Sequence, residues 1–406
     1  MYFNNYQYLK NKEIYIFILL ICFSVLVRIP AILIFGDTGL ENEWKDILIN
    51  LSQHGEFTFR RFGDFALPSL YMPPLYPMYL YFFSFFNLEQ QNYIFLILSS
   101  QIVLASISIV IFYKINKLFF SERISFYSSL LFSVFPLHIY ACTQISSVSL
   151  QSFLSILFFY LLFQIVKKKN ILSIFYFSIT SGLLVLLRGE FIAILVLSLF
   201  YLFIFFRIKI KNIILILLIT LITISPYLIR NIYTFNTITI TKSFGYNLWK
   251  GNNPNSQVEG SKSIDIKIQE KLEKIPKDKF YQINRDNLFL EEAKKNIINE
   301  PGRYLVLYFK KLLSFLFIDI NSSLSYYYNP LHYIPVLFIG IISFFGIFLS
   351  NKKSKELNYF IFIFIFTILL FSCFAILARY KMIILPIQII FINVLIEWIL
   401  KKKFRQ

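Results

Sequence analysis

Acidic side chains gather in the segment that follows the first apolar run. Asp37, Glu41, Glu43 and Asp46 lie close together in a chain of which only 15% of the residues are charged. A carboxylate can take the proton of an attacking hydroxyl group, so this segment is a candidate source of a general base. Glu43 begins a stretch with apolar residues at helical spacing, which predicts a short amphipathic helix. Helix capping, which favours acids in a first turn, is the alternative role of Glu43.

Cationic side chains at the ends of later apolar runs could bind a phosphate group and stabilise its negative charge. Two of them have an alternative role. Arg188 could form a salt bridge with Glu190, and Arg379 could anchor the chain at the membrane interface. The candidate phosphate ligands are Arg230, Arg188, Lys242, Arg379 and Lys381.

The stretch TKSFGYNLWKGNNP at residues 241–254 combines glycines, amides and cations. We expect it to form a loop, because such a loop can approach a phosphate or a sugar with backbone N–H and amide groups. Earlier in the chain, the turn MPPLYP at residues 72–77 closes the acidic segment. The candidate sugar or loop contacts are Tyr76, Glu190, Asn231, Asn247, Gly251, Asn252 and Asn253.

Metal-binding and cofactor-binding patterns are absent from the sequence. The three histidines are isolated, and the three cysteines lie in or beside apolar runs without a pairing pattern. No spacing of His, Cys and carboxylates predicts a metal site, and no glycine-rich fingerprint predicts a nucleotide. We therefore expect no metal and no cofactor, and a divalent cation on the acidic loop is the alternative that stays open.

The composition is that of a membrane protein. Hydrophobic residues make up 57% of the 406 residues and the mean hydropathy is +0.64, whereas a soluble domain carries about 25% charged residues. We therefore expect one all-α polytopic membrane domain over residues 1–406. The net charge of +18 would favour nucleic acid in a soluble protein. Here Lys and Arg cluster in short loops between apolar runs, which indicates contact with a bilayer and no nucleic-acid partner.

About ten apolar runs are long enough to cross a bilayer, which takes about 20 residues each. If the N-terminus is cytoplasmic, every lysine-rich cluster falls on the cytoplasmic side, and so does the C-terminus. Two long segments, 36–92 and 231–330, then form outer loops with interfacial helices at about 75–86 and 304–318. The predicted runs are 14–35, 93–113, 124–140, 148–166, 171–187, 191–206, 213–229, 333–349, 359–377 and 382–400.

The order of these motifs resembles that of a known family. An acidic first outer loop closed by PPLYP is followed by LLRGE, SPYLIRN, GYNLWKGNNP and ARYKMIILP. This order is similar to that of bacterial polyprenyl-phosphate-sugar-dependent glycosyltransferases related to the aminoarabinose transferase and the protein O-mannosyltransferases (glycosyltransferase family 39). The resemblance covers about residues 1–400. It implies the GT-C fold, a sugar donor on a lipid phosphate, and a catalytic carboxylate in the first outer loop.

By position, the resemblance assigns the catalytic carboxylate to Glu43, which precedes Trp44, with Asp37 and Glu41 as rivals. The chain departs from the family's pattern at two places. Many relatives carry an acid at the start of the fourth span, where this chain reads ISSVSL at residues 145–150, and a histidine near the last motif, where it reads ARYK at 378–381. The first departure argues against a two-acid mechanism.

Sequence and resemblance together predict a membrane glycosyltransferase. It would move a hexosyl or pentosyl group from a polyprenyl-phosphate donor, such as undecaprenyl phosphate, to a hydroxyl of a lipid, glycan or protein acceptor, as in lipopolysaccharide modification. Because a lipid phosphate is a good leaving group, a carboxylate base suffices, and attack from the opposite face inverts the anomeric carbon. The Ile, Phe, Lys and Asn bias suggests a bacterium, and thus an active site on the periplasmic face of the cytoplasmic (inner) membrane.

Two other functions remain as alternatives. A lipid-linked glycan polymerase or ligase uses the same class of donor on the same face. A flippase or transporter of a lipid-linked solute would carry charged residues and broken helices within its spans, whereas the spans predicted here are nearly free of charge.

Overall fold

The computed structural model is almost wholly helical. It describes residues 2–40, 42–59, 61–62, 65–322, 329–350 and 354–403. Glu41 and parts of the lysine clusters at 352–355 and 401–405 lie outside these ranges. The predicted class, an all-α polytopic membrane protein, is confirmed. Strand structure within the described ranges is a small antiparallel hairpin formed by β1 (Arg61–Phe62) and β2 (Phe65–Ala66).

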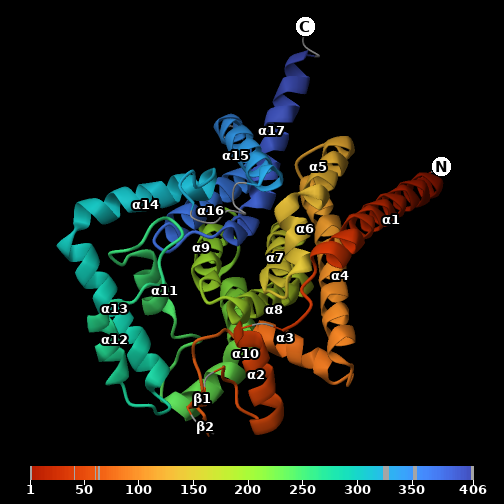
Figure 1. Ribbon diagram of the computed structural model, residues 1–406. Coiled ribbons are helices and arrows are strands. Elements are labelled where there is room, and N and C mark those ends of the chain that lie inside the picture. Colours follow the sequence, from red (N-terminus) through yellow and green to blue (C-terminus); the bar gives the residue numbers. More distant parts are fainter. Residues whose placement is uncertain are drawn as a thin grey trace.

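A helix occupies most of each predicted apolar run (Figure 1). The bent α5–α6 pair fills the third run, because Pro136 lacks an N–H and opens a break between the two helices. In chain order the helices are α1 (Tyr2–Phe35), α2 (Asn42–His54), α3 (Leu75–Ser84), α4 (Gln90–Asn116), α5 (Glu122–Val134), α6 (Pro136–Thr143), α7 (Val148–Lys168), α8 (Ile171–Leu187), α9 (Phe191–Ile204), α10 (Ile210–Phe235), α11 (Phe244–Gly251), α12 (Ile266–Glu273), α13 (Tyr281–Asn299), α14 (Pro301–Leu316), α15 (Pro330–Ser350), α16 (Lys355–Phe371), the 3₁₀ helix η2 (Ala378–Ile383) and α17 (Leu385–Lys403).

Five helices of the described chain are long and apolar enough to cross a membrane: α1, α4, α7, α10 and α15. The pair α5 and α6, bent by 49° between the two helices, would make a sixth span if counted as one. Helices α8 and α9 are apolar but shorter. The number of about ten spans therefore stays a prediction.

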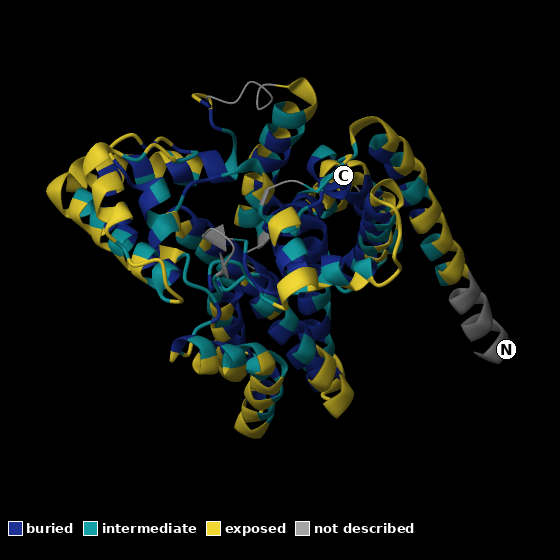
Figure 2. Ribbon diagram, turned by 60° about the horizontal axis from the view of Figure 1, so that its bottom comes forward, coloured by how far each residue is buried: buried dark blue, intermediate teal, exposed yellow. Residues whose placement is uncertain are grey.

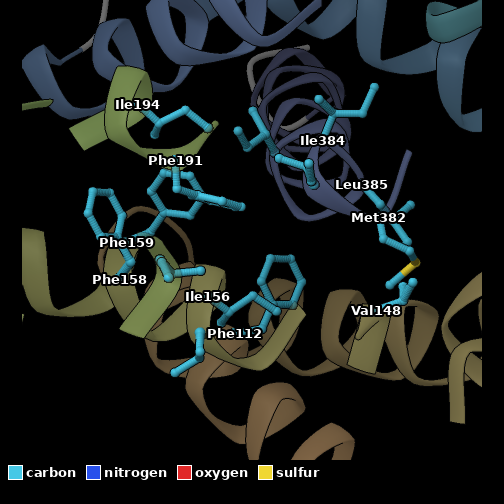
Figure 3. Packing of buried hydrophobic residues seen from close by; sticks show 14 of the residues in the cluster. Phe112, Val148, Ile156, Phe158, Phe159, Phe191, Ile194, Met382, Ile384 and Leu385 are labelled. Atoms are coloured by element: carbon cyan, nitrogen blue, oxygen red, sulfur yellow. The ribbon is translucent and has the colours of Figure 1, made fainter. Parts of the chain in front are cut away.

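The core lies where the middle of the chain meets its C-terminal part. Phe158 and Phe159 of α7 pack near Phe191 of α9, and Ile384 and Leu385 lie across from them (Figure 3). Large apolar side chains are instead exposed along α1, α10 and α15, and the arm of α1 that leads away from the bundle is mostly exposed (Figure 2). Exposed apolar faces on such long helices suit contact with lipid.

Helices α11–α13 form a small group beside the main bundle, and α14 runs from this group towards α15 (Figure 1). Trp249 of α11 packs on Phe289 of α13, with ring centroids 4.6 Å apart. The backbone N–H of Tyr246 donates to Asp286 Oδ1 at 2.9 Å. The predicted interfacial helix at about 304–318 is largely α14.

The prediction of a loop over residues 241–254 was wrong in its central part, which is helix α11. Gly245 and Gly251 are not loop residues here; they allow close packing of the helix. A Cβ on Gly245 would lie 2.1 Å from Asp286 O, and one on Gly251 would lie 2.7 Å from the backbone nitrogen of Ala375. The glycines therefore serve the approach of two backbones, which is their other common use.

We expect Gly245→Ala to lower the thermal stability of the detergent-solubilised protein. The added methyl group has no room against Asp286 and Leu290, and overpacking of this kind costs about 1–3 kcal/mol. Gly302→Ala is the matched control, because a Cβ at this position of α14 meets nothing within 4 Å. Equal unfolding temperatures for the two variants would contradict the packing described here.

Candidate functional site

Asp37 connects the end of α1 to the corner between α6 and α7. Its backbone N–H donates to Thr143 O at 2.9 Å, and its Oδ2 accepts a hydrogen bond from the backbone N–H of Ile145 at 2.6 Å. The side chain is half-buried. Two bonds to neighbouring backbone groups therefore fix both the position and the orientation of this carboxylate.

Aromatic residues of segment 36–92, the predicted first outer loop, pack near Asp37. The ring of Tyr76 lies edge-on to Trp44 of α2, with centroids 5.0 Å apart. Tyr76 is buried, and its hydroxyl group has no hydrogen-bond partner in the described part of the chain. Burial, and after it the nearby Tyr79 and Asp37, raises the pKa of Tyr76 well above its usual value. The hydroxyl group thus stays protonated and is an unused buried donor.

The other acids of the first loop are held less firmly. Glu43 lies in the first turn of α2, as expected from the helical spacing, and is half-buried. It forms no ion pair or side-chain hydrogen bond with residues that the structure describes. Asp46 is exposed on the same helix, and Glu41 lies outside the described ranges. Asp37 and Glu43 are therefore the two predicted acids whose geometry can be compared.

The 3₁₀ helix η2 borders the corner that Asp37 occupies. It packs against both α6 and α7, and Figure 3 shows Met382 of η2 beside Val148, the first residue of α7. On its other side, the ring of Tyr380 faces Arg188, whose guanidinium lies 5.2 Å from the ring centroid. One short helix therefore contacts both the helices that flank the corner of Asp37 and the cation at the end of α8.

The two predicted outer loops, segments 36–92 and 231–330, meet next to Arg188. A Cβ on Gly189 would lie 3.5 Å from Thr241 Oγ1, and the backbone N–H of Lys242 donates to Leu70 O at 2.7 Å. Arg188 also pairs with Glu190 at 3.2 Å, so the salt bridge considered as an alternative is present. The guanidinium contacts Tyr380 at the same time, so the pair lies at the border of the site.

We use the name cation cluster for three side chains from different segments of the chain, Lys250, Lys262 and Arg379. These segments contact one another through their backbones. The backbone N–H of Ser261 donates to Lys250 O at 2.8 Å, and a Cβ on Gly260 would lie 2.7 Å from the Cβ of Ala375. Burial lowers the pKa of Lys250, and the charges of Lys262 and Arg379 lower it further. Within the described ranges none of the three forms an ion pair. Their mutual repulsion favours binding of an anion.

Two other predicted phosphate ligands are already bonded to backbone carbonyl groups. Arg230 donates to Ser69 O at 3.1 Å and lies among three aromatic rings, so it fastens the first outer loop to α10. Lys381 is buried and donates to Ser314 O at 2.7 Å and to Phe317 O. Burial lowers the pKa of Lys381 to about 7. Both side chains hold segments together in this structure.

The predicted amide contacts mostly hold the second outer loop together. Asn231 donates to Thr239 O, Asn252 donates to Leu248 O and Cys373 O, and Asn253 donates to Ser261 O. Gly251 O accepts from the buried ammonium of Lys311. Asn247 is exposed on α11. The amides therefore shape the loop that carries the cation cluster.

Sequence reasoning missed two members of the cation cluster. Lys250 lies within the motif GYNLWKGNNP, so the motif itself carried a signal for it. Lys262 follows in a short polar stretch whose spacing indicates no function, and only the fold brings it to Lys250 and Arg379. Among the described residues, no group of three or more His, Cys, Asp or Glu side chains is arranged to hold a metal ion.

Comparison with known proteins gives matches of two kinds. Residues 72–229 match the family model described as dolichyl-phosphate-mannose-protein mannosyltransferase. Among solved structures, the oligosaccharyltransferase of Archaeoglobus fulgidus in its apo form is similar at 11% identity and a TM-score of 0.54, over 96% of this chain and 51% of that one. The same protein tethered to an acceptor peptide containing the NVT sequon is similar at 12% identity and a TM-score of 0.58, over 97% and 50%.

The chain spans about half the length of these solved relatives, and at such low identity the likeness concerns the fold. No curated protein sequence matches the chain significantly. The family match, which runs from the MPPLYP turn into α10, comes from sequence alone and agrees with the fold. Residues 72–229 are thus similar to this mannosyltransferase family, and the fold of the chain is similar to that of the oligosaccharyltransferase, in agreement with the resemblance of its motifs.

Proposed function

We propose that this protein transfers a sugar from a polyprenyl-phosphate donor to an acceptor hydroxyl group. One observation carries the proposal: η2, which contributes Arg379 to the cation cluster, packs on α6 and α7, whose junction fixes the carboxylate of Asp37. The carboxylate suits a base for the attacking hydroxyl group, and the cations suit a departing phosphate. The matched family's description, which names a mannose carried on dolichyl phosphate, supports a lipid-phosphate donor.

The proposed reaction is a single displacement. The carboxylate removes the proton of the acceptor hydroxyl group while its oxygen attacks the anomeric carbon from the face opposite the phosphate. The bond between that carbon and the phosphate oxygen breaks, and the lipid phosphate leaves with the electron pair. The cation cluster stabilises the negative charge that develops on the phosphate. The sugar is transferred with inversion.

Asp37 is better placed than Glu43 to act as this base. Asp37 donates its backbone N–H to Thr143 O and accepts from the Ile145 N–H, which holds it in one orientation, and such positioning contributes directly to the rate of a displacement. Glu43 is longer and has no bonded partner in the described chain, so positioning it costs side-chain entropy. The unused hydroxyl group of Tyr76 near Asp37 suits a hydrogen bond to the sugar or the acceptor.

The proposed cellular location and orientation of the protein follow from its predicted membrane topology. We propose a multi-pass protein of the bacterial cytoplasmic membrane, with cytoplasmic termini and a site that faces the periplasm or exterior. Lipid, glycan and protein hydroxyl groups are all acceptors of suitable chemistry. The solved relative was studied with an acceptor peptide, which is consistent with a protein acceptor but does not single it out.

Incubation of the purified full-length protein with a panel of polyprenyl-phosphate sugars tests the function. We expect at least one donor to lose its sugar and release polyprenyl phosphate, and the release to rise when an acceptor is added. If the protein moves intact lipid-linked sugars across proteoliposomes without cleaving them, it is a flippase. Products with several sugars in a growing chain would identify a polymerase.

Asp37→Asn should lower the turnover of the preferred donor by about 100- to 10,000-fold, the usual contribution of a general base. Asparagine retains an oxygen to accept from the Ile145 N–H, so the corner and the fold should persist. Glu43→Gln is the matched control and should change turnover by less than about tenfold. The reverse outcome, with Glu43→Gln inactive and Asp37→Asn active, would assign the base to Glu43.

Replacing Lys262 and Arg379 together by Ala should raise the donor KM by about tenfold or more, because a tenfold change corresponds to only about 1.4 kcal/mol. The donor KM of the unaltered protein should also rise with salt concentration, and this dependence should weaken in the variant. Lys267→Ala with Lys274→Ala removes the same charge from exposed positions outside the cluster and serves as control. An equal effect of the two double variants would exclude the cation cluster as the phosphate site.

A further inference from the structure

Gln101 is a fully buried amide near the middle of an apolar helix. It belongs to α4, which is long and apolar enough to cross a membrane. Burying an amide in such surroundings costs free energy unless the amide is hydrogen-bonded, so a polar side chain at this position needs a reason. The proposed displacement leaves Gln101 without a role.

The side-chain nitrogen of Gln101 is directed at the corner between α6 and α7. Its Nε2 donates to Gln144 O at 2.9 Å and, over a longer distance of 3.4 Å, to Cys142 O. Both neighbours are carbonyl oxygens, which can only accept, so the nitrogen of the amide must face them. A donor from α4 therefore reaches the backbone on which Asp37 is held.

Gln101 and Asp37 bind the two ends of one peptide group. The carbonyl of Gln144 and the N–H of Ile145 belong to the same planar amide, in which they point in opposite directions. Gln101 Nε2 donates to that carbonyl, and Asp37 Oδ2 accepts from that N–H at 2.6 Å. The peptide group thus lies between a side chain of α4 and the carboxylate that follows α1.

The backbone next to this peptide group is also shared between the two sides. Gln144 is extended, with φ −107° and ψ 138°, so the carbonyl groups before and after its Cα point to opposite sides. Gln144 O faces Gln101, whereas Thr143 O accepts from the backbone N–H of Asp37 at 2.9 Å. A rotation of this short segment would therefore displace both bonds that hold Asp37.

The bond from Gln101 is not needed to satisfy Gln144 O. This oxygen also accepts from the backbone N–H of Ser146 at 2.9 Å. In addition, Oε1 of Gln101 is buried and has no hydrogen-bond partner in the described part of the chain. An unpaired buried oxygen costs free energy that an apolar side chain would avoid. What Gln101 adds is an orienting contact from a distant helix.

We propose that Gln101 is a positioning residue for Asp37, because it orients the peptide group whose N–H directs the carboxylate. The inference rests on the proposed function, since it concerns the base of the proposed transfer. Hydrogen bonds in a chain polarise one another, so the bond to Gln144 O also strengthens the Ile145 N–H as a donor. Gln101 itself contacts no reacting atom.

Capping of α6 is the competing role of Gln101. The last carbonyl groups of a helix have no partner within it, and Cys142 lies in the last turn of α6. A cap would stabilise the protein whatever stands at the other end of the peptide group. The two roles differ once Asp37 can no longer act as a base, because a residue that acts through Asp37 then has nothing to position.

Gln101→Met, alone and combined with Asp37→Asn, tests the proposal. Methionine has a similar shape but no donor. With the polyprenyl-phosphate sugar that turns over fastest, we expect Gln101→Met to lower kcat by about 10- to 100-fold and to change the donor KM by less than about twofold, because a small misplacement of a catalytic group acts on the rate. In the Asp37→Asn background, single turnovers with radiolabelled donor should differ by less than about twofold. An equal loss in both backgrounds would overturn the proposal and leave Gln101 as a cap.

Asn116→Leu is the matched control. Asn116 is also a fully buried amide of α4, but it lies at the end of the helix away from the corner, where it donates to Phe112 O and accepts from Asn393. We expect a lower unfolding temperature and a kcat changed by less than about twofold, because this site is distant from Asp37. If Asn116→Leu lowers kcat as much as Gln101→Met, lost stability explains both results and the proposal is wrong. Gln101→Asn, whose amide is one methylene shorter and falls short of Gln144 O, replaces Gln101→Met if that variant does not fold.

Hydrogen exchange separates this inference from the proposed function. In the full-length protein, the peptic fragment that contains Ile145 should exchange its amides faster in Gln101→Met and at the unaltered rate in Asn116→Leu. Unchanged exchange in Gln101→Met would refute the contact. Because this measurement needs no sugar transfer, faster exchange in a protein that transfers no sugar would retain the contact and refute the proposed function. Transfer with an unchanged kcat in Gln101→Met would retain the proposed function and refute the positioning role.

Discussion

The corner between α6 and α7 is the constraint on which the candidate site depends. Polar groups inside a membrane protein must find partners within the protein, because lipid offers none. Arg28 of α1 is fully buried and meets this need with Ser24 and with His138 of α6, whose Nδ1 lies 2.8 Å from Arg28 Nη2. Gln101 of α4 donates to Gln144 O at 2.9 Å. Helices α1 and α4 thus both form hydrogen bonds to the corner and hold it in place.

This corner fixes the position of Asp37. The other segments of the site are positioned relative to the same corner through η2. Because η2 packs on α6 and α7, the segment that carries Arg379 and Tyr380 is placed relative to the same corner. The second outer loop is then attached to it through Val258 and Ile376. A few backbone hydrogen bonds thus bring together residues that are far apart in the chain. The predicted outer loops therefore need no large hydrophobic core of their own.

The helices could be predicted from the sequence because hydrophobic runs of the required length leave little other choice in lipid. The short amphipathic helix with Glu43 in its first turn was also foreseen from spacing alone. Helix α11 was not, because Gly245 and Gly251 suggest a loop until the backbones that they contact are known. The choice between Asp37 and Glu43 likewise depends on which of them has its backbone bonded to Thr143 and its carboxylate bonded to Ile145. Such contacts between distant segments leave no local pattern.

If the chain catalyses the proposed transfer, the cation cluster has a consequence for the end of the catalytic cycle. A sugar phosphodiester carries one negative charge, whereas the lipid phosphate that remains after transfer is a monoester with close to two at neutral pH. If the charges of Lys250, Lys262 and Arg379, which have no ion partner among the described residues, bind the phosphate as proposed, they hold the product more tightly than the donor. Release of the spent lipid carrier would then limit turnover, and enzymes that remove or recycle this carrier would set the pace of the reaction in the membrane.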